Sequence, residues 1–151
     1  GLQKPDKDIN STKLKHPPFT FDIPTFEPGT LTARGISKGK VLAETTVKTP
    51  ELPTKIKLSW DRSAKDMKAG SNDVVFVYAS VTDANGTVNP NFNGLVEFNV
   101  SGDGSLIGAN PIKAEAGIAT ILVKAGLKPG KILVQAKALG LNEDALTLTS
   151  K

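Results

Sequence analysis

Residues 95–100 have the sequence Leu-Val-Glu-Phe-Asn-Val, in which apolar and polar side chains alternate. Three other stretches alternate in the same way, Phe19-Thr-Phe-Asp-Ile23, Lys55-Ile-Lys-Leu-Ser59 and Lys131-Ile-Leu-Val-Gln-Ala-Lys137. Successive side chains of a strand point to opposite faces, so each stretch has one face for a core and one for water. Gly, Pro, Asn and Asp separate the stretches, which predicts an all-β fold of antiparallel strands.

The composition favours two thin sheets over one large core. The 151 residues are 38% hydrophobic, and they include one Trp, one Tyr, six Phe and no Cys. The absence of Cys excludes disulfides and thiolate metal sites. No apolar run approaches the ~18 residues that a membrane span needs, so we expect no membrane insertion. The chain lacks an initiator Met and a signal-peptide pattern at its start, so we expect a processed piece of a longer precursor.

The net charge of +4 comes from 19 basic and 15 acidic residues that are scattered along the chain. A nucleic-acid surface would need basic residues in a stripe, with aromatic side chains between them for stacking. The sequence has no such stripe. We therefore interpret the basic residues as a solvated surface and expect no nucleic-acid partner.

Proline clusters divide the chain. Residues 1–18 are expected to form a polar arm, and residues 19–47 a three-stranded meander with a hairpin turn at Ser37–Lys40. Arm and meander together make up a partial immunoglobulin-like module, residues 1–49. Residues 50–53 are interpreted as a proline linker. Three strands with one apolar face are marginal alone, so this module should need a partner surface.

Residues 54–151 have about the length of an immunoglobulin-like β-sandwich. We expect Val74–Thr82 to be a central strand, because it is apolar on both faces, and a short strand near Arg62–Lys68. Alternation places Val96, Phe98 and Val100 inward, facing Ile132, Val134 and Ala136. The strands expected in this region are Lys55–Ser59, Val74–Thr82, Leu95–Val100, Gly117–Lys124, Lys131–Ala138 and Ala145–Thr149.

The sequence contains no coherent catalytic constellation. A glycosidase needs two carboxylates that flank the scissile bond, whereas the acidic residues here fall on wet strand faces or in turns, as do Glu44, Glu97, Asp103 and Glu115. His16, the sole histidine, precedes two prolines and has no apparent nucleophile or orienting acid. We expect no catalytic residue and no cofactor.

Binding motifs are equally sparse. The segment Asp83-Ala-Asn-Gly86 lacks the further ligands of a calcium loop and is interpreted as a turn. Trp60 and Tyr78 are the candidates for stacking on a sugar ring. Trp60 shares a face with Ile56 and Leu58, which favours a position at the rim of the core. The N-glycosylation patterns that begin at Asn10, Asn85 and Asn99 are taken as chance matches.

Two sets of motifs, taken in order, resemble known modules. The first set resembles the region downstream of the catalytic barrel in bacterial β-galactosidases of glycoside hydrolase family 2, and consists of His16-Pro-Pro-Phe-Thr-Phe-Asp-Ile-Pro24, Phe26-Glu-Pro-Gly-Thr-Leu-Thr-Ala33, Gly39-Lys-Val-Leu-Ala43 and Val47-Lys-Thr49. The second resembles the invasin/intimin-type immunoglobulin-like domain that ends many such enzymes, and includes Ile56-Lys-Leu58, Val81-Thr-Asp-Ala-Asn-Gly86, Val96-Glu-Phe-Asn-Val-Ser-Gly102 and Pro129-Gly-Lys-Ile132.

This resemblance implies a non-catalytic accessory domain of a β-galactosidase-like enzyme, since the family's catalytic glutamates belong to the barrel and match nothing here. Its partners would be other domains of the parent enzyme, at a domain contact, a cleft rim or an oligomer contact. It also implies a periplasmic or extracellular location. The first module lacks a segment that relatives have, so self-association through its unpaired edge is a further expectation. The alternatives are a carbohydrate-binding module that uses Trp60 or Tyr78, and an adhesin-type spacer.

Overall fold

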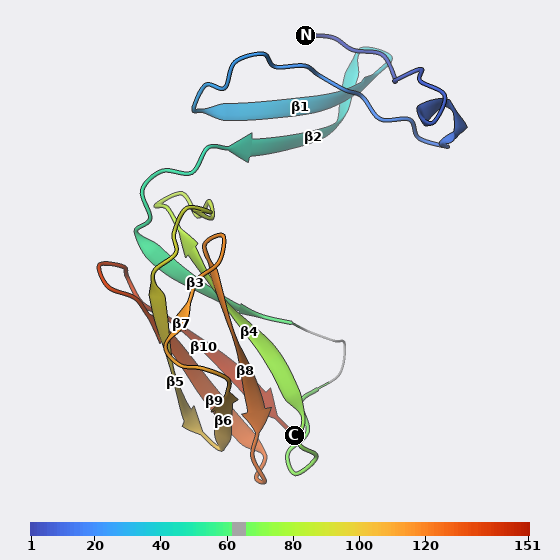
Figure 1. Ribbon diagram of the computed structural model, residues 1–151. Coiled ribbons are helices and arrows are strands. Elements are labelled where there is room, and N and C mark those ends of the chain that lie inside the picture. The colour runs from blue at the N-terminus through green and yellow to red at the C-terminus, as the bar shows by residue number, and fades with distance from the viewer. Residues whose placement is uncertain (62–65) are drawn as a thin grey trace. The chain divides into compact units, whose positions relative to one another are not determined.

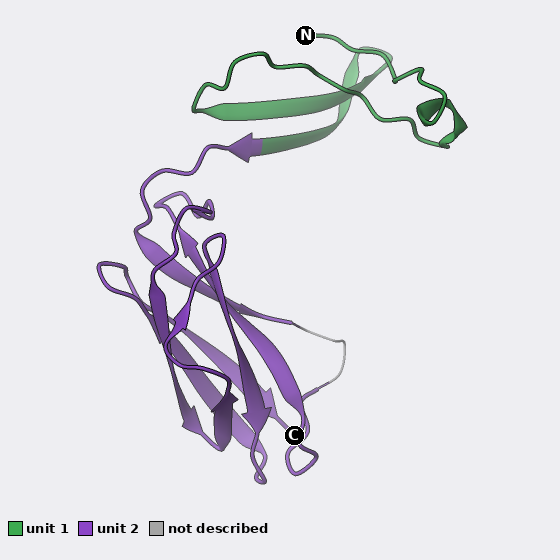
Figure 2. Cartoon of the chain, in the orientation of Figure 1, with its two compact units in different colours: residues 1–46 green, residues 47–151 purple. Residues whose placement is uncertain are grey.

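The computed structural model describes residues 1–61 and 66–151, and the fold is all-β, as predicted (Figure 1). The chain forms two compact units, Gly1–Thr46 (unit 1) and Val47–Lys151 (unit 2) (Figure 2). In chain order the elements are the 3-10 helix η1 (Ser11–Lys13) and the strands β1 (Thr30–Ser37), β2 (Lys40–Lys48), β3 (Lys55–Trp60), β4 (Val74–Thr82), β5 (Leu95–Gly102), β6 (Gly104–Ile107), β7 (Ile112–Lys113), β8 (Ile118–Ala125), β9 (Gly130–Lys137) and β10 (Asp144–Ser150).

Unit 1 contains a two-stranded sheet, in which β1 and β2 form a hairpin. Its turn, predicted from the sequence, is made by Lys38 and Gly39, whose φ angles of 48° and 75° suit a two-residue hairpin loop. Across the hairpin, the Thr32 and Thr46 hydroxyls lie 3.1 Å apart, and the Arg34 Nε donates to Glu44 Oε2 at 2.5 Å.

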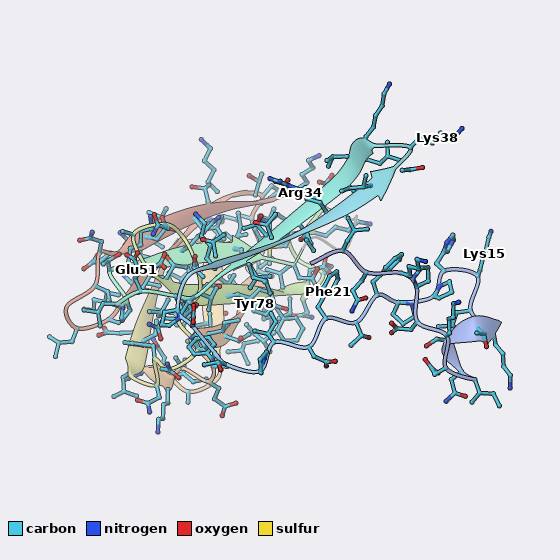
Figure 3. The ribbon with its side chains drawn as sticks, turned by 90° about the horizontal axis from the view of Figure 1, so that it is seen from above. Lys15, Phe21, Arg34, Lys38, Glu51 and Tyr78 are labelled. Atoms are coloured by element: carbon cyan, nitrogen blue, oxygen red, sulfur yellow. The ribbon has the colours of Figure 1, made fainter. Side chains whose placement is uncertain are left out.

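The prediction of a third meander strand at residues 19–23 is wrong, because this segment joins no sheet. Prolines flank it on both sides and restrict the backbone there. The segment is instead held by Asp6, whose carboxylate accepts hydrogen bonds from the Thr20 amide at 3.2 Å and the Thr20 hydroxyl at 2.5 Å. Figure 3 labels Phe21 on this segment and Arg34 on β1.

Unit 2 is the predicted sandwich. Its two antiparallel sheets have the strand orders β10-β9-β5-β7 and β3-β4-β8-β6. All six strands expected from the sequence are present to within two residues at each end. The short strands β6 and β7 were not predicted. The strand expected near Arg62–Lys68 falls partly on residues 62–65, which lie outside the described residues, while Met67 makes an isolated bridge to Ser150.

The core lies between the two sheets and agrees with the predicted pattern. As expected, β4 is an inner strand that pairs with both β3 and β8. The six residues predicted to face inward from β5 and β9 are buried or pack against the core. The fully buried side chains with the largest volumes are Ile121, Ile132, Leu148, Val77, Val81, Val96, Val123 and Val134.

Side-chain carboxylates and carboxamides satisfy main-chain groups at the sheet edges. The Leu58 amide on β3 donates to Asp144 Oδ2 at 2.7 Å. On β5, the Phe98 amide donates to Asn110 Oδ1 at 2.8 Å, and Asn110 Nδ2 donates to the Phe98 carbonyl at 2.7 Å. The Asn110 side chain thus takes the place of a paired strand where the two-residue pairing with β7 has ended.

Candidate interaction surface

The two candidates for sugar stacking lie on opposite faces of one sheet. Trp60 is partly buried and packs against the core, which matches the rim position expected from its face. Tyr78 points outward, since the β4 residues on either side of it, Val77 and Ala79, are fully buried. Tyr78 and Trp60 therefore do not form one platform. Figure 3 labels Tyr78.

Tyr78 instead belongs to an apolar outer face of the β3-β4-β8-β6 sheet. Its ring stacks on that of Phe76, with centroids 6.2 Å apart and an angle of 14° between the planes. Phe76, which is 47% exposed, lies opposite Leu122 on β8, and Leu122 lies opposite Ile107 on β6. These side chains form a cross-strand apolar row in which Phe76 and Ile107 are exposed.

The four carboxylates considered as catalytic candidates are dispersed. Glu44 pairs with Arg34, Glu97 pairs with Lys137 at 3.3 Å, and the Asp103 carboxylate accepts a hydrogen bond from the Lys128 amide. Each lies on a different strand or turn, as does Glu115. His16 is exposed.

Neither a metal centre nor a membrane helix emerges from the described residues. Across ranges 1–61 and 66–151, no three His, Cys, Asp or Glu side chains gather closely enough to hold a metal ion. No helix in the same ranges is long and apolar enough to cross a membrane.

The Asp83 carboxylate accepts main-chain hydrogen bonds that could not be predicted from the sequence. Asp83 is 1% exposed and accepts hydrogen bonds from the Glu51 amide at 3.0 Å and the Thr87 amide at 2.9 Å. The Glu51 N–H is the largest cause of a lowered Asp83 pKa. Asn89 completes the arrangement by donating to the Glu51 carbonyl at 2.7 Å. The segment interpreted as a linker is thus part of unit 2 and is hydrogen-bonded within it at Glu51, which Figure 3 labels.

A second exposed apolar surface lies on the hairpin of β1 and β2. Every residue of β1 and β2 is exposed. A Cβ built on Gly35 would lie 3.6 Å from the Ala43 Cβ, so these two residues share one face, opposite to that of Thr32 and Arg34. Strand alternation adds further members to this apolar hairpin face, which comprises Leu31, Ala33, Gly35, Val41, Ala43 and Val47, with Thr45 between the last two.

The large side chains of the apolar hairpin face are exposed to solvent. Leu31 is 58% exposed, Val41 54% and Val47 67%. Four large side chains of the preceding segment are also about half exposed or more: Phe19, Phe21, Ile23 and Phe26. A two-stranded hairpin is only marginally stable by itself in water, and an exposed apolar surface of this kind is typical of interaction sites.

Comparison with known proteins finds relatives that are similar over both units of the chain. The family model described as "Glycoside hydrolase family 2 C-terminal domain 5" matches residues 56–147, more than half of the chain. A β-galactosidase of Thermoanaerobacter pseudethanolicus is 34% identical over 152 residues, which cover 95% of this chain and 20% of that protein.

Solved structures give the same result. A glycosyl hydrolase family 2 member from Bacteroides cellulosilyticus is similar with a TM-score of 0.73 and 28% identity, over 83% of this chain and 18% of that one. The D00-D0 domain of intimin is similar in fold, with a TM-score of 0.53 and 22% identity over 81% of this chain and 63% of that one.

The chain thus spans about a fifth of the length of the family 2 relatives described above. The resemblance to family 2 β-galactosidases and to intimin-type domains is confirmed. Since the family model covers most of the sandwich, the chain belongs to the glycoside hydrolase family 2 C-terminal domain 5 family.

Proposed function

We propose that this chain is a non-catalytic accessory region of a β-galactosidase-like glycoside hydrolase, and that the apolar hairpin face packs against another domain of the parent polypeptide. One observation carries the proposal: all residues of β1 and β2 are exposed, although one face of the hairpin has no charged side chain. The similarity to a β-galactosidase five times as long supports a longer parent polypeptide that contains further domains.

The energetic argument favours a protein cover over water. Full burial of a Leu or Val side chain stabilises a structure by about 1.5–3 kcal/mol. Leu31, Val41 and Val47 are each more than half exposed, so a contact with another domain could still gain much of this stabilisation. The other face of the hairpin carries the Arg34–Glu44 ion pair, and alternation places Ile36 and Leu42 there as well. The face without charged side chains is therefore the better suited of the two to a domain contact.

Two adjacent substitutions test the packing role in the full-length parent. Leu31→Lys places a charge on the apolar hairpin face, whereas Thr32→Lys places the same charge on the opposite face, which already carries the Arg34–Glu44 pair, one residue away. We expect Leu31→Lys to lower the stability of the parent by about 1–2 kcal/mol, and Thr32→Lys to change it by less than about 0.5 kcal/mol. Equal effects in thermal unfolding would contradict a contact through this face.

Hydrogen exchange provides an independent test of the same role. In the chain alone, amides of residues 30–48 should exchange far faster than those of β4, β8 and β9, because local stability follows burial. In the full-length parent, residues 30–48 should become protected. Fast exchange in both would refute the proposed cover.

The non-catalytic assignment has a direct assay. The chain alone should not hydrolyse a chromogenic galactoside, since its carboxylates are dispersed and a glycosidase needs two that flank one bond. Measurable turnover that survives purification would refute this part of the proposal.

A further inference from the structure

The outer face of the other sheet of unit 2 carries a hollow with a different chemistry. The antiparallel register of β5 and β9 places Glu97 opposite Lys137 and Asn99 opposite Gln135. Opposed residues of this kind share one face and have Cβ atoms about 4.5–5.5 Å apart. With Glu143 from the loop before β10, they line a hollow of about 260 Å³.

The polar groups in this hollow are available to a ligand. The side chains of Asn99, Gln135 and Glu143 make no hydrogen bond or ion pair within residues 1–61 and 66–151. The Glu97–Lys137 pair, 3.3 Å apart, is about half exposed on both sides. Two carboxamides, two carboxylates and one ammonium group therefore face the same space with both donors and acceptors.

An apolar wall adjoins these polar groups. A second hollow, of about 480 Å³, shares Glu97, Lys137 and Glu143 with the first and extends to Leu95, Pro111 and Leu139. Leu139 is 100% exposed and Leu95 59%. The combined surface has mixed donors and acceptors on one side and apolar side chains on the other.

We infer that this surface is a binding site for a neutral saccharide. A hydroxyl group donates and accepts hydrogen bonds at once, so adjacent hydroxyls suit carboxamides and carboxylates that alternate across two strands. The C–H groups of the sugar would contact the apolar wall. The two carboxylates and one ammonium group give a local charge of about −1, which disfavours anionic ligands such as uronates or phosphates.

This inference moves the candidate carbohydrate site away from Trp60 and Tyr78, which belong to the other sheet. It is also independent of the packing role proposed for unit 1, because it concerns only strands and loops of unit 2. A failure of one proposal leaves the other standing.

Amide chemical shifts of the ¹⁵N-labelled chain test the inference. The probes are galactose and a β-1,4-linked galactobiose as neutral sugars, and glucuronate as an anion. We expect the neutral sugars to shift amides of residues 95–99 and 135–143, with a Kd of about 1 mM for the disaccharide. Glucuronate should bind at least about threefold more weakly.

Paired variants locate the site. The double substitution Asn99→Ala/Gln135→Ala should weaken galactobiose binding about tenfold or more, with no loss of fold because both side chains are exposed. Thr147→Ala/Thr149→Ala removes polar groups from exposed positions on the same sheet outside the hollow, and should leave binding unchanged. The inference would be overturned by shifts centred on Phe76 and Tyr78, by undiminished binding in the Asn99/Gln135 variant, by glucuronate binding as tightly as the neutral sugars, or by no shifts at all.

Discussion

The side chain of Asn110 is predicted to stabilise the sandwich through its hydrogen bonds to β5. The substitution Asn110→Ala removes two hydrogen bonds, both to the main chain of Phe98 on β5. Each bond is part-buried, and a hydrogen bond of this type contributes about 1 kcal/mol net. We therefore expect the free energy of unfolding to fall by about 2 kcal/mol.

This loss converts into a measurable temperature shift. Unit 2 has roughly 105 residues, so its unfolding entropy near the midpoint is about 0.2 kcal/mol/K. A loss of 2 kcal/mol then lowers Tm by about 9 °C, which calorimetry of the chain resolves easily. The open edge of β5 should also increase aggregation on heating.

Asn99→Ala is the matched control for this prediction. It makes the same chemical change on β5 itself, but the Asn99 side chain has no hydrogen-bond partner among the described residues. Its Tm should change by no more than about 2 °C. If Asn110→Ala is as mild as Asn99→Ala, the edge-capping role assigned to Asn110 is incorrect.

Two other predictions concern unit 2. The Asp83 pKa is lowered, so its contribution to stability is present above the unfolded value of 3.8 and is lost as pH falls below it; Asp83→Asn should flatten Tm against pH in this acidic range, and an unchanged profile would contradict the assignment. Ile132→Ala, at a fully buried position of β9, should cost about 2–5 kcal/mol in urea unfolding, whereas Lys131→Ala beside it should cost less than about 0.5.

Alternation predicted the strands of unit 2 because each has one face against the core. At β9, Ile132, Val134 and Ala136 are buried while Lys131 and Gln135 are exposed, as a period of two requires. The sequence also indicated that the outer face of β4 is apolar, because the residues around Phe76 form an unbroken apolar run. Its central position follows from that run, since an inner strand can present apolar groups on both faces.

Other features could not be predicted because they depend on contacts between distant residues. Asp144 bonds to Leu58 across 86 positions of sequence, and Asp83 bonds to Glu51 across 32. Nothing in the local pattern around either carboxylate indicates its partner. The hollow between β5 and β9 was missed for the same reason, because the register that places Asn99 opposite Gln135 joins segments 36 residues apart.

The wrong strand at residues 19–23 shows where alternation alone is insufficient. Its pattern matches that of the true strands, but Pro18 and Pro24 flank it, and a strand also needs a neighbour that can complete its hydrogen bonds. In unit 1 the Asp6 side chain supplies bonds to Thr20 that a neighbouring strand would otherwise make. A polar arm can therefore hold an alternating segment extended without a sheet.

The two units differ in how completely they bury their apolar side chains and hydrogen-bond their main-chain groups. In unit 2, two sheets cover each other, and the side chains of Asn110 and Asp144 form hydrogen bonds with main-chain groups at the sheet edges. In unit 1, a single hairpin exposes both faces and buries no large apolar side chain. Cooperative unfolding requires a shared core, so a thermal transition of the chain alone reports on unit 2, and unit 1 gains comparable stability only when its apolar hairpin face is covered.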